Sequence, residues 1–272
     1  MTRFTTAVLL LCVAALPVFA DETATAEKAE LGQKAPPIEM TDTDGGSFSL
    51  HDCRIAKKDA ETAVRKAAID AGLAADASLD TKLSDLPGVK GDDGADDDKV
   101  LEVVRAAGRP FGLVATTDSI ANVKTLAEVV TWIEKADAAP ILLMTWSPRC
   151  PTTRNLNDRI VETAAEHSIR IYAVACNFLD TEAMFDKHKS MLDFPIRIFP
   201  DREQKVTDIL GGKATPHFFL FDKDGTLKYR GGLDNDPRGG LEADEREHWL
   251  ADAAAAVCTG KDVAVQETAA AG

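Results

Sequence analysis

One cysteine stands where a strand gives way to a helix, in the segment MTWSPRCPTTRN at residues 144–155. The apolar run ILLMTW at residues 141–146 predicts a buried strand, and an amphipathic helix is predicted after Pro151. Proline suits the first helical turn, where its missing N–H group costs no hydrogen bond. Because the free N–H groups and the dipole of a helix start stabilise an anion, we predict that the pKa of Cys150 lies below the usual value of about 8.5. Its thiolate would be a nucleophile at the end of a strand.

The neighbours of Cys150 help to separate a reactive cysteine from a structural one. Arg149 and Arg154 add positive charge, which also favours the thiolate. A buried structural cysteine is the common alternative. Ser147 and Pro148 are residues that form loops, so the sequence favours the reactive interpretation.

Three other cysteines follow the first fifty residues. Cys176 ends a predicted buried strand, and the carboxyl ends of parallel strands share one edge of a sheet. Two interpretations stay open for it: a thiol that resolves Cys150, or a buried residue at a strand end. Cys53 follows a predicted hairpin, and Cys258 lies among alanines in a helix where a core position is expected. No cysteine pair has the spacing of a zinc site, so we predict neither a metal nor a cofactor.

The composition excludes some partners and suggests a compartment. The chain has 272 residues and a net charge of −14, which argues against nucleic acid or an anionic membrane surface as a partner. Residues 1–20 have a basic residue, an apolar run and a Val-Phe-Ala ending, which predicts a signal peptide cleaved after Ala20. The apolar run is too short to span a membrane. We therefore expect an exported protein, periplasmic or extracellular.

The rest of the chain divides into segments that differ in composition and in hydrophobic pattern. Two alternating runs around Asp44-Gly45-Gly46 predict a β-hairpin. Helices are expected within residues 56–73, 98–108 and 119–136, the last capped by Asp118 or Ser119. Five aspartates in residues 88–99 do not fit the EF-hand spacing and predict a solvated loop. The expected organisation is a signal peptide at 1–20, a flexible linker at 21–34, a hairpin at 35–54, a mainly helical insertion at 55–138, a core at 139–265 and a tail at 266–272.

The core pattern predicts a fold. From residue 139 the order is strand, helix, strand, helix, a short strand, a helix, a hairpin and a final helix. A strand–helix–strand unit gives parallel strands, and the closing hairpin adds antiparallel ones. This is the order of the thioredoxin fold, an α/β fold with a central mixed sheet flanked by helices.

A Thr-Pro pair precedes the first strand of the closing hairpin. A proline at that place is often cis, and in this topology Thr215 and Pro216 would lie beside Cys150. The alternative is an ordinary proline at the start of a strand.

At these residues the chain resembles the redoxin family, the peroxiredoxin-like branch of the thioredoxin superfamily, and within it a subgroup of secreted bacterial proteins. The resemblance covers residues 31–54 and 139–272 and rests on GQKAPPIEM, DGGSFSLHD, TWSPRCP and ATPHFFLFDKDGTLKYRGGLDND. It implies that Cys150 is the redox-active nucleophile, that Pro216 is a cis-proline facing it, and that Thr215 offers main-chain contacts to a substrate. Trp146 matches the tryptophan that often precedes the motif.

The chain also departs from the family. A two-cysteine motif would need cysteine where Thr153 stands, and a peroxiredoxin motif would need proline where Leu143 stands. Ser147 is an acceptable substitute for the threonine of that motif. The residues expected to contact substrate are Trp146, Ser147, Pro151, Thr153, Thr215 and Pro216.

Two functions remain open. The first is an exported oxidoreductase that works through one nucleophilic cysteine on a protein disulfide, a small-molecule disulfide or a peroxide, with Cys176 or an external thiol as reductant. The second is a binding module that kept the fold and lost turnover.

Overall fold

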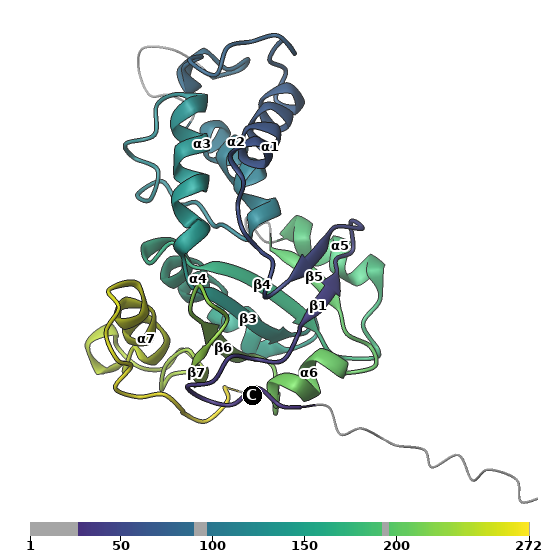
Figure 1. The fold of residues 1–272 in the computed structure, drawn as a ribbon, viewed down its shortest axis with the longest axis vertical. Helices are drawn as coiled ribbons and strands as arrows, with labels where there is room; N and C mark the ends of the chain where they lie inside the picture. Colours follow the sequence, from purple (N-terminus) through teal and green to yellow (C-terminus); the bar gives the residue numbers. More distant parts are fainter. Residues whose placement is uncertain (1–26, 90–96, 192–195, 272) are drawn as a thin grey trace, which may run out of the picture.

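The computed structural model describes residues 27–89, 97–191 and 196–271. Its centre is a five-stranded mixed sheet in the order β5-β4-β3-β6-β7 (Figure 1). β3, β4 and β5 are parallel, while β6 and β7 are antiparallel to their neighbours. The predicted thioredoxin-like fold class is confirmed. The strands are β3 (Ile141–Trp146), β4 (Arg170–Ala175), β5 (Arg197–Pro200), β6 (His217–Phe221) and β7 (Leu227–Gly231).

Helices connect the strands and close the domain. They are α4 (Pro151–Glu166), α5 (Glu182–Met191), α6 (Lys205–Leu210) and α7 (Trp249–Cys258), with a 3₁₀ turn η4 (Ala243–Glu245) before α7. Because α4 carries the chain from β3 to the parallel strand β4, the carboxyl ends of both strands meet at one edge of the sheet.

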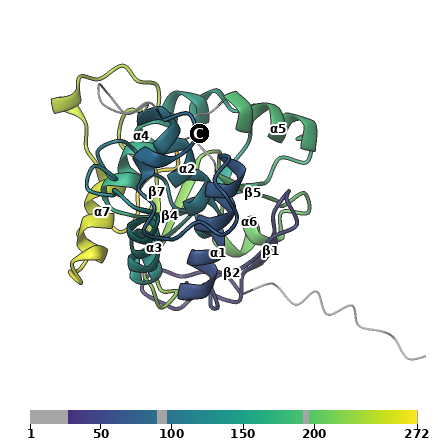
Figure 2. The ribbon, with the colours of Figure 1, turned by 90° about the horizontal axis from the view of Figure 1, so that it is seen from above.

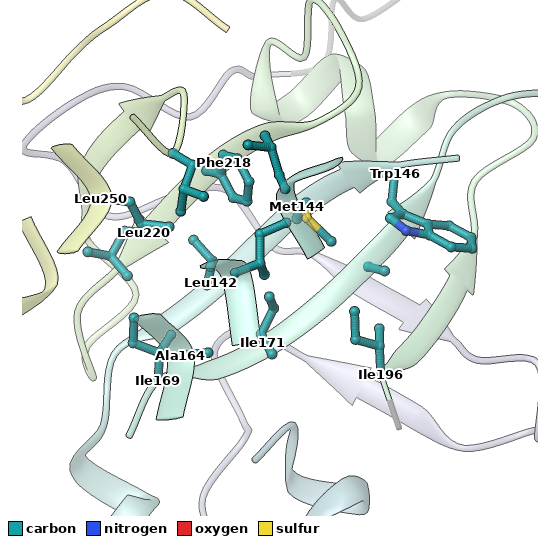
Figure 3. Close-up of a cluster of buried hydrophobic side chains, with 14 of the residues drawn as sticks. Leu142, Met144, Trp146, Ala164, Ile169, Ile171, Ile196, Phe218, Leu220 and Leu250 are labelled. Carbon is teal, nitrogen blue, oxygen red and sulfur yellow. The ribbon is translucent and has the colours of Figure 1, made fainter. Parts of the chain in front are cut away.

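The sheet is buried on both faces, which explains its nearly continuous apolar strands. Side chains alternate, so Leu142, Met144 and Trp146 face α4 and α7, and Ile141 and Leu143 face the other way. Figure 3 shows the first of these clusters, from Leu250 of α7 at one end to Trp146 at the other. The second face packs against α6 and the predicted hairpin, which the structure confirms as β1 (Glu39–Thr41) and β2 (Ser47–Ser49).

A helical segment with its own apolar cluster precedes β3. Figures 1 and 2 show its three helices grouped on one side of the sheet domain. All three predicted helices are present; residues 90–96 of the predicted acidic loop lie outside the described residues. The elements are α1 (Lys57–Asp70), η1 (Leu83–Asp85), α2 (Asp97–Gly108), η2 (Arg109–Phe111), α3 (Leu126–Lys135) and η3 (Ala136–Ala138).

The start of α3 differs from the prediction. Its cap is Thr125, not Asp118 or Ser119, and the helix begins at Leu126. The Thr125 hydroxyl accepts a hydrogen bond from the Glu128 amide (3.2 Å), and the Glu128 carboxylate accepts one from the Thr125 amide (3.0 Å). This reciprocal capping box satisfies two amides at once, so it defines the helix start better than a single cap upstream.

The helical segment joins the sheet through close backbone contacts. Gly112 has φ +73°, and a Cβ there would lie 2.6 Å from the Tyr172 ring. Its carbonyl oxygen accepts a 2.8 Å hydrogen bond from the Ile171 amide. Only glycine combines this backbone conformation with so close an approach.

Both ends of the described chain pack on the core. Ala29, in the predicted linker, is 1 % exposed and its amide donates to the Ile209 carbonyl. In the predicted tail, Thr268 donates its amide to the Arg230 carbonyl beside β7. Main-chain hydrogen bonds thus hold parts of residues 27–34 and 266–271 against the folded domain.

Candidate active site

Cys150 lies at the predicted junction between strand and helix. It is the N-cap of α4, with φ −75° and ψ 118°, and Pro151 is the first helical residue. Its amide donates to the Ser147 carbonyl (3.1 Å), which closes the turn that leads out of β3. The residue is partly exposed to solvent.

A second loop faces this cysteine. The Thr215–Pro216 peptide bond is cis, as predicted. β6 runs antiparallel to β3 with His217 opposite Thr145, so the loop before β6 lies beside the loop after β3. The Cys150 sulfur is 2.8 Å from the Thr215 carbonyl oxygen, to which the thiol donates a hydrogen bond.

The surroundings favour the thiolate of Cys150. Burial by itself raises the pKa of the thiol, but the side chain of Thr215, the amide and hydroxyl of Thr153 and the amide of Thr152 together lower the pKa by more. The net effect is a pKa below the ordinary value. These groups belong to the first turn of α4 and to the facing loop, so the helix start acts as predicted.

Thr153 occupies the position of the second cysteine in a two-cysteine motif. It is 2 % exposed, and its hydroxyl has no hydrogen-bond partner among the protein groups that the structure describes. A buried hydroxyl without a partner costs free energy. Because this hydroxyl lowers the pKa of Cys150, its donor is available to the thiolate.

Thr145 positions the loop and was not anticipated from the sequence. Its hydroxyl donates to the Ala214 carbonyl (2.6 Å) and accepts a hydrogen bond from the His217 amide (2.9 Å). This fully buried side chain thereby ties β3 to both sides of the cis peptide. A threonine in an apolar strand is the only signal that the sequence gives of this role.

The residues predicted to contact substrate separate into two groups. Pro151 is exposed and Thr215 half-exposed, so both are accessible at the surface beside Cys150. Ser147 and Pro216 are buried, and Trp146 is 1 % exposed. The Trp146 ring packs 6.0 Å from that of Phe185. The side chains of Trp146, Ser147, Thr153 and Pro216 are thus directed into the core, and the contact predicted between these residues and a substrate stays a prediction.

A buried carboxylate, that of Asp180, lies in the segment after β4, near Ser147 and Arg149. Asp180 is 0 % exposed, and neither of its oxygens has a hydrogen-bond partner among the described groups. Burial raises the pKa of Asp180, while Ser147, Arg149 and Arg202 oppose the rise. Arg149, expected to act on Cys150, thus acts on this carboxylate. Asp180 follows β4, and nothing in the sequence marked it.

Cys53, Cys176 and Cys258, the other cysteines that the structure describes, are also free thiols. Cys176 is buried at the predicted edge, its sulfur 4.0 Å from the Trp146 carbonyl oxygen, and burial raises its pKa. Burial also raises the pKa of Cys53 and Cys258. Cys258 is exposed, so the core position expected for it is wrong: it ends α7, and its thiol donates a hydrogen bond to the His167 carbonyl (3.5 Å).

Comparison with known proteins places the fold in a family. A profile of the thioredoxin-like domain family matches residues 99–237, half of the chain. The chain belongs to the thioredoxin-like domain family. The match includes Cys150 and the Thr215–Pro216 loop, and it begins inside α2, within the segment predicted as an insertion. No curated protein matches the chain.

Several solved structures are similar to this thioredoxin-like protein. An uncharacterized conserved protein from Geobacillus kaustophilus is 17 % identical, with 88 % of this chain and 87 % of that chain covered and a TM-score of 0.51. A hypothetical protein from Sinorhizobium meliloti 1021 is 17 % identical, over 90 % and 94 % of the two chains, with a TM-score of 0.48. A secreted Mycobacterium tuberculosis disulfide oxidoreductase is 19 % identical, over 44 % and 82 %, with a TM-score of 0.35. At 17 % identity, the likeness to the Geobacillus kaustophilus protein concerns the fold alone.

No helix among the described residues has both the length and the apolar character needed to cross a bilayer.

Proposed function

We propose that this thioredoxin-like protein is a redoxin-type thiol oxidoreductase that works through Cys150. The observation that carries the proposal is a half-exposed thiol at a helix start, with a lowered pKa, 2.8 Å from the carbonyl oxygen before a cis-proline. A thiolate that is both stabilised and accessible is the attacking group in thiol–disulfide exchange.

The favoured reaction is exchange with a disulfide. The Cys150 thiolate attacks one sulfur, a new S–S bond forms, and the departing thiolate takes up a proton. A second thiol then attacks the mixed disulfide and releases Cys150. The Thr215 main chain at the sulfur supports this branch, because an extended peptide beside Cys150 would find a backbone partner there.

Peroxide reduction is the second branch. The thiolate would attack one peroxide oxygen, the O–O bond would break, the leaving oxygen would take a proton, and Cys150 would become a sulfenic acid. A thiol would then convert the sulfenic acid to a disulfide and water. The surroundings favour this branch less, since Ser147 is buried and no arginine is among the main causes of the lowered Cys150 pKa.

Turnover needs a second thiol. Cys176 lies at the same edge but is buried, and its pKa is raised. An external thiol reductant is therefore the favoured partner, with Cys176 as the internal alternative.

We also propose that the protein acts outside the cytosol, in the periplasm or beyond, because of the leader at residues 1–20. Identification of Asp21 as the first residue of the exported protein would support this proposal.

The decisive experiment follows the alkylation of each cysteine against pH by mass spectrometry, on the reduced protein. Cys258 is the internal control, since it is exposed and its pKa is raised, whereas that of Cys150 is lowered. The Cys258 rate should fall about tenfold for each pH unit below its pKa, while the Cys150 rate should stay high well below pH ~8. Oxidised glutathione should then add to Cys150 and not to the Cys150→Ser variant.

The competing function is a binding module without turnover, and Thr153 in place of a second cysteine is the observation that favours it. A Cys150 that is alkylated no faster than Cys258 at low pH, and that forms no adduct, would support the binding module. A fast Cys150 with repeated turnover of a disulfide in the presence of a thiol would exclude it.

A further inference from the structure

We propose that a cavity on the opposite edge of the sheet from Cys150 binds a small anion bearing a carboxylate or phosphate group, independently of the redox chemistry. The cavity has a volume of about 560 Å³, within the range of small-molecule sites. It lies between the β1–β2 hairpin, residues 52–54, residues 110–111 and the first residues of β4 and β5. We call it the arginine cavity, because Arg54, Arg170 and Arg197 line it.

One buried cation in this cavity has no counterion among the described residues. Arg170 is 4 % exposed. Its Nε donates to the Phe111 carbonyl (3.0 Å), its Nη1 to the Cys53 carbonyl (2.7 Å) and its Nη2 to the Tyr172 hydroxyl (3.1 Å). These acceptors are all neutral, and none of the ion pairs within the described residues involves Arg170. A buried charge without a counterion is costly, so a bound anion would stabilise this site.

The other charged residues of the arginine cavity do not neutralise the charge of Arg170. Arg197 is also buried, but its Nε is 2.7 Å from the Asp42 carboxylate, so its charge is matched. Glu39 and Asp52 line the cavity as well. Both are exposed, and solvent weakens the interaction of their charges with a buried guanidinium. The buried part of the lining therefore keeps an excess of positive charge.

Neutral groups complete a site for oxygen atoms. Thr41, Ser47 and Ser49 line the cavity from the hairpin, and Thr41 pairs with Ser47 across the two strands. Their hydroxyls form no hydrogen bond to other protein groups in the described part of the chain, so they are free to donate to anionic oxygens. A polyanion is disfavoured by the net charge of −14, and the limited volume favours a small molecule.

Cys53 provides a built-in reporter, because its thiol also lines the arginine cavity. The rate of Cys53 alkylation would be measured on the wild-type protein at about pH 8, with Cys258 as the control. Inorganic phosphate and succinate would be titrated separately, with sodium chloride holding the ionic strength constant. A ligand at ten times its dissociation constant should slow Cys53 about tenfold and leave Cys258 unchanged. Protection by phosphate alone, by succinate alone or by both assigns the anion class and supports the site.

Two variants of one residue test the charge. Ser49→Glu places a fixed carboxylate on the cavity wall and should abolish the protection of Cys53, whereas the neutral Ser49→Gln should retain it. Loss of protection in both variants, or in neither, would contradict a charge-based site. No protection of wild-type Cys53 by either anion, or equal slowing at Cys258, would overturn the proposal without recourse to any variant.

Discussion

Thr145 and His217 face each other across β3 and β6, and the Thr145 hydroxyl accepts a 2.9 Å hydrogen bond from the His217 amide. The same hydroxyl donates to the Ala214 carbonyl at 2.6 Å. One side chain thus holds both sides of the loop whose Thr215 carbonyl lies at the Cys150 sulfur. The geometry of the candidate site depends on this residue, which itself is buried beneath it.

Replacing Thr145 should therefore weaken both the fold and the site. Thr145→Val keeps the shape but leaves the His217 amide without a partner, so the free energy of unfolding should fall by about 1–3 kcal/mol. The alkylation of Cys150 near neutral pH should slow as Thr215 loosens. Denaturant unfolding and labelling measure the two effects. Thr145→Ser, which keeps the hydroxyl, should retain both properties; a valine variant that reacts like wild type would contradict the role.

Thr153 should affect reactivity without supporting stability. Thr153→Val removes a hydroxyl that stabilises the Cys150 thiolate, so the Cys150 pKa should rise and alkylation at pH ~6 should slow about tenfold. Because that hydroxyl is buried without a partner, the unfolding free energy should not decrease. Thr153→Ser serves as the control that retains the donor. An unchanged pH profile in the valine variant would show that the hydroxyl does not act on the sulfur.

Asp180 should destabilise the protein near neutral pH. Burial raises its folded pKa above the unfolded value, so its unfavourable contribution is absent at acid pH and grows as pH rises through the folded pKa. Asp180→Asn should stabilise the protein by about 1–3 kcal/mol at pH ~8, with a smaller gain near pH ~4. Unfolding in denaturant at the two pH values provides the comparison. A loss of stability at both would indicate that the carboxylate has a favourable partner.

His217 should give the opposite dependence on pH. Burial lowers its pKa from 6.5 to about 4, so the unfolded state binds a proton that the folded state does not. The contribution of His217 to the free energy of unfolding is fully present above pH ~6.5. It is lost as the pH falls toward 4, and the loss is about 3 kcal/mol at most. His217→Gln lacks this titration, and its stability curve should be flatter in that interval. Parallel curves for the two proteins would argue against a buried neutral histidine.

Gly112 should tolerate no side chain. Gly112→Ala combines a strained backbone with a Cβ 2.6 Å from the Tyr172 ring, so a loss of about 2–4 kcal/mol is expected. Gly32 is a matched control, because its φ is +74° and a Cβ added there would meet nothing within 4 Å. Gly32→Ala should cost only the backbone part, about 1 kcal/mol. Equal losses in the two variants would mean that the Tyr172 contact is unimportant.

Local patterns were enough to predict the elements that position Cys150. The apolar run before it and the proline after it place it at the start of α4, and the antiparallel hairpin at the end of the chain brings Thr215 opposite. The position of Cys150 depends only on residues within a few positions of it. The position of Thr215 depends on the order and handedness of the connections between strands, and few folds are compatible with that order.

Features that depend on burial or on distant partners were not predictable. The packing of Trp146 in the core depends on the face to which strand alternation directs it, and its expected contact with substrate stays a prediction. The role of Thr145 requires the register between strands about seventy residues apart. Asp180 has the same residue type as many exposed aspartates, and only the packed loop after β4 distinguishes it. The start of α3 was misplaced because several residues upstream can each cap a helix, and only the reciprocal pair at Thr125 and Glu128 decides.

The attachment of the helical segment to the sheet has a consequence for how the sequence can change. Arg170 binds the carbonyl oxygens of Cys53 and Phe111, and Arg197 binds that of Pro110. Every residue type carries a carbonyl group, so positions 53, 110 and 111 can be substituted without loss of these hydrogen bonds. The two arginines cannot be replaced so freely. These three positions can therefore vary while Arg170 and Arg197 preserve the attachment to the sheet, whereas Gly112 beside them cannot.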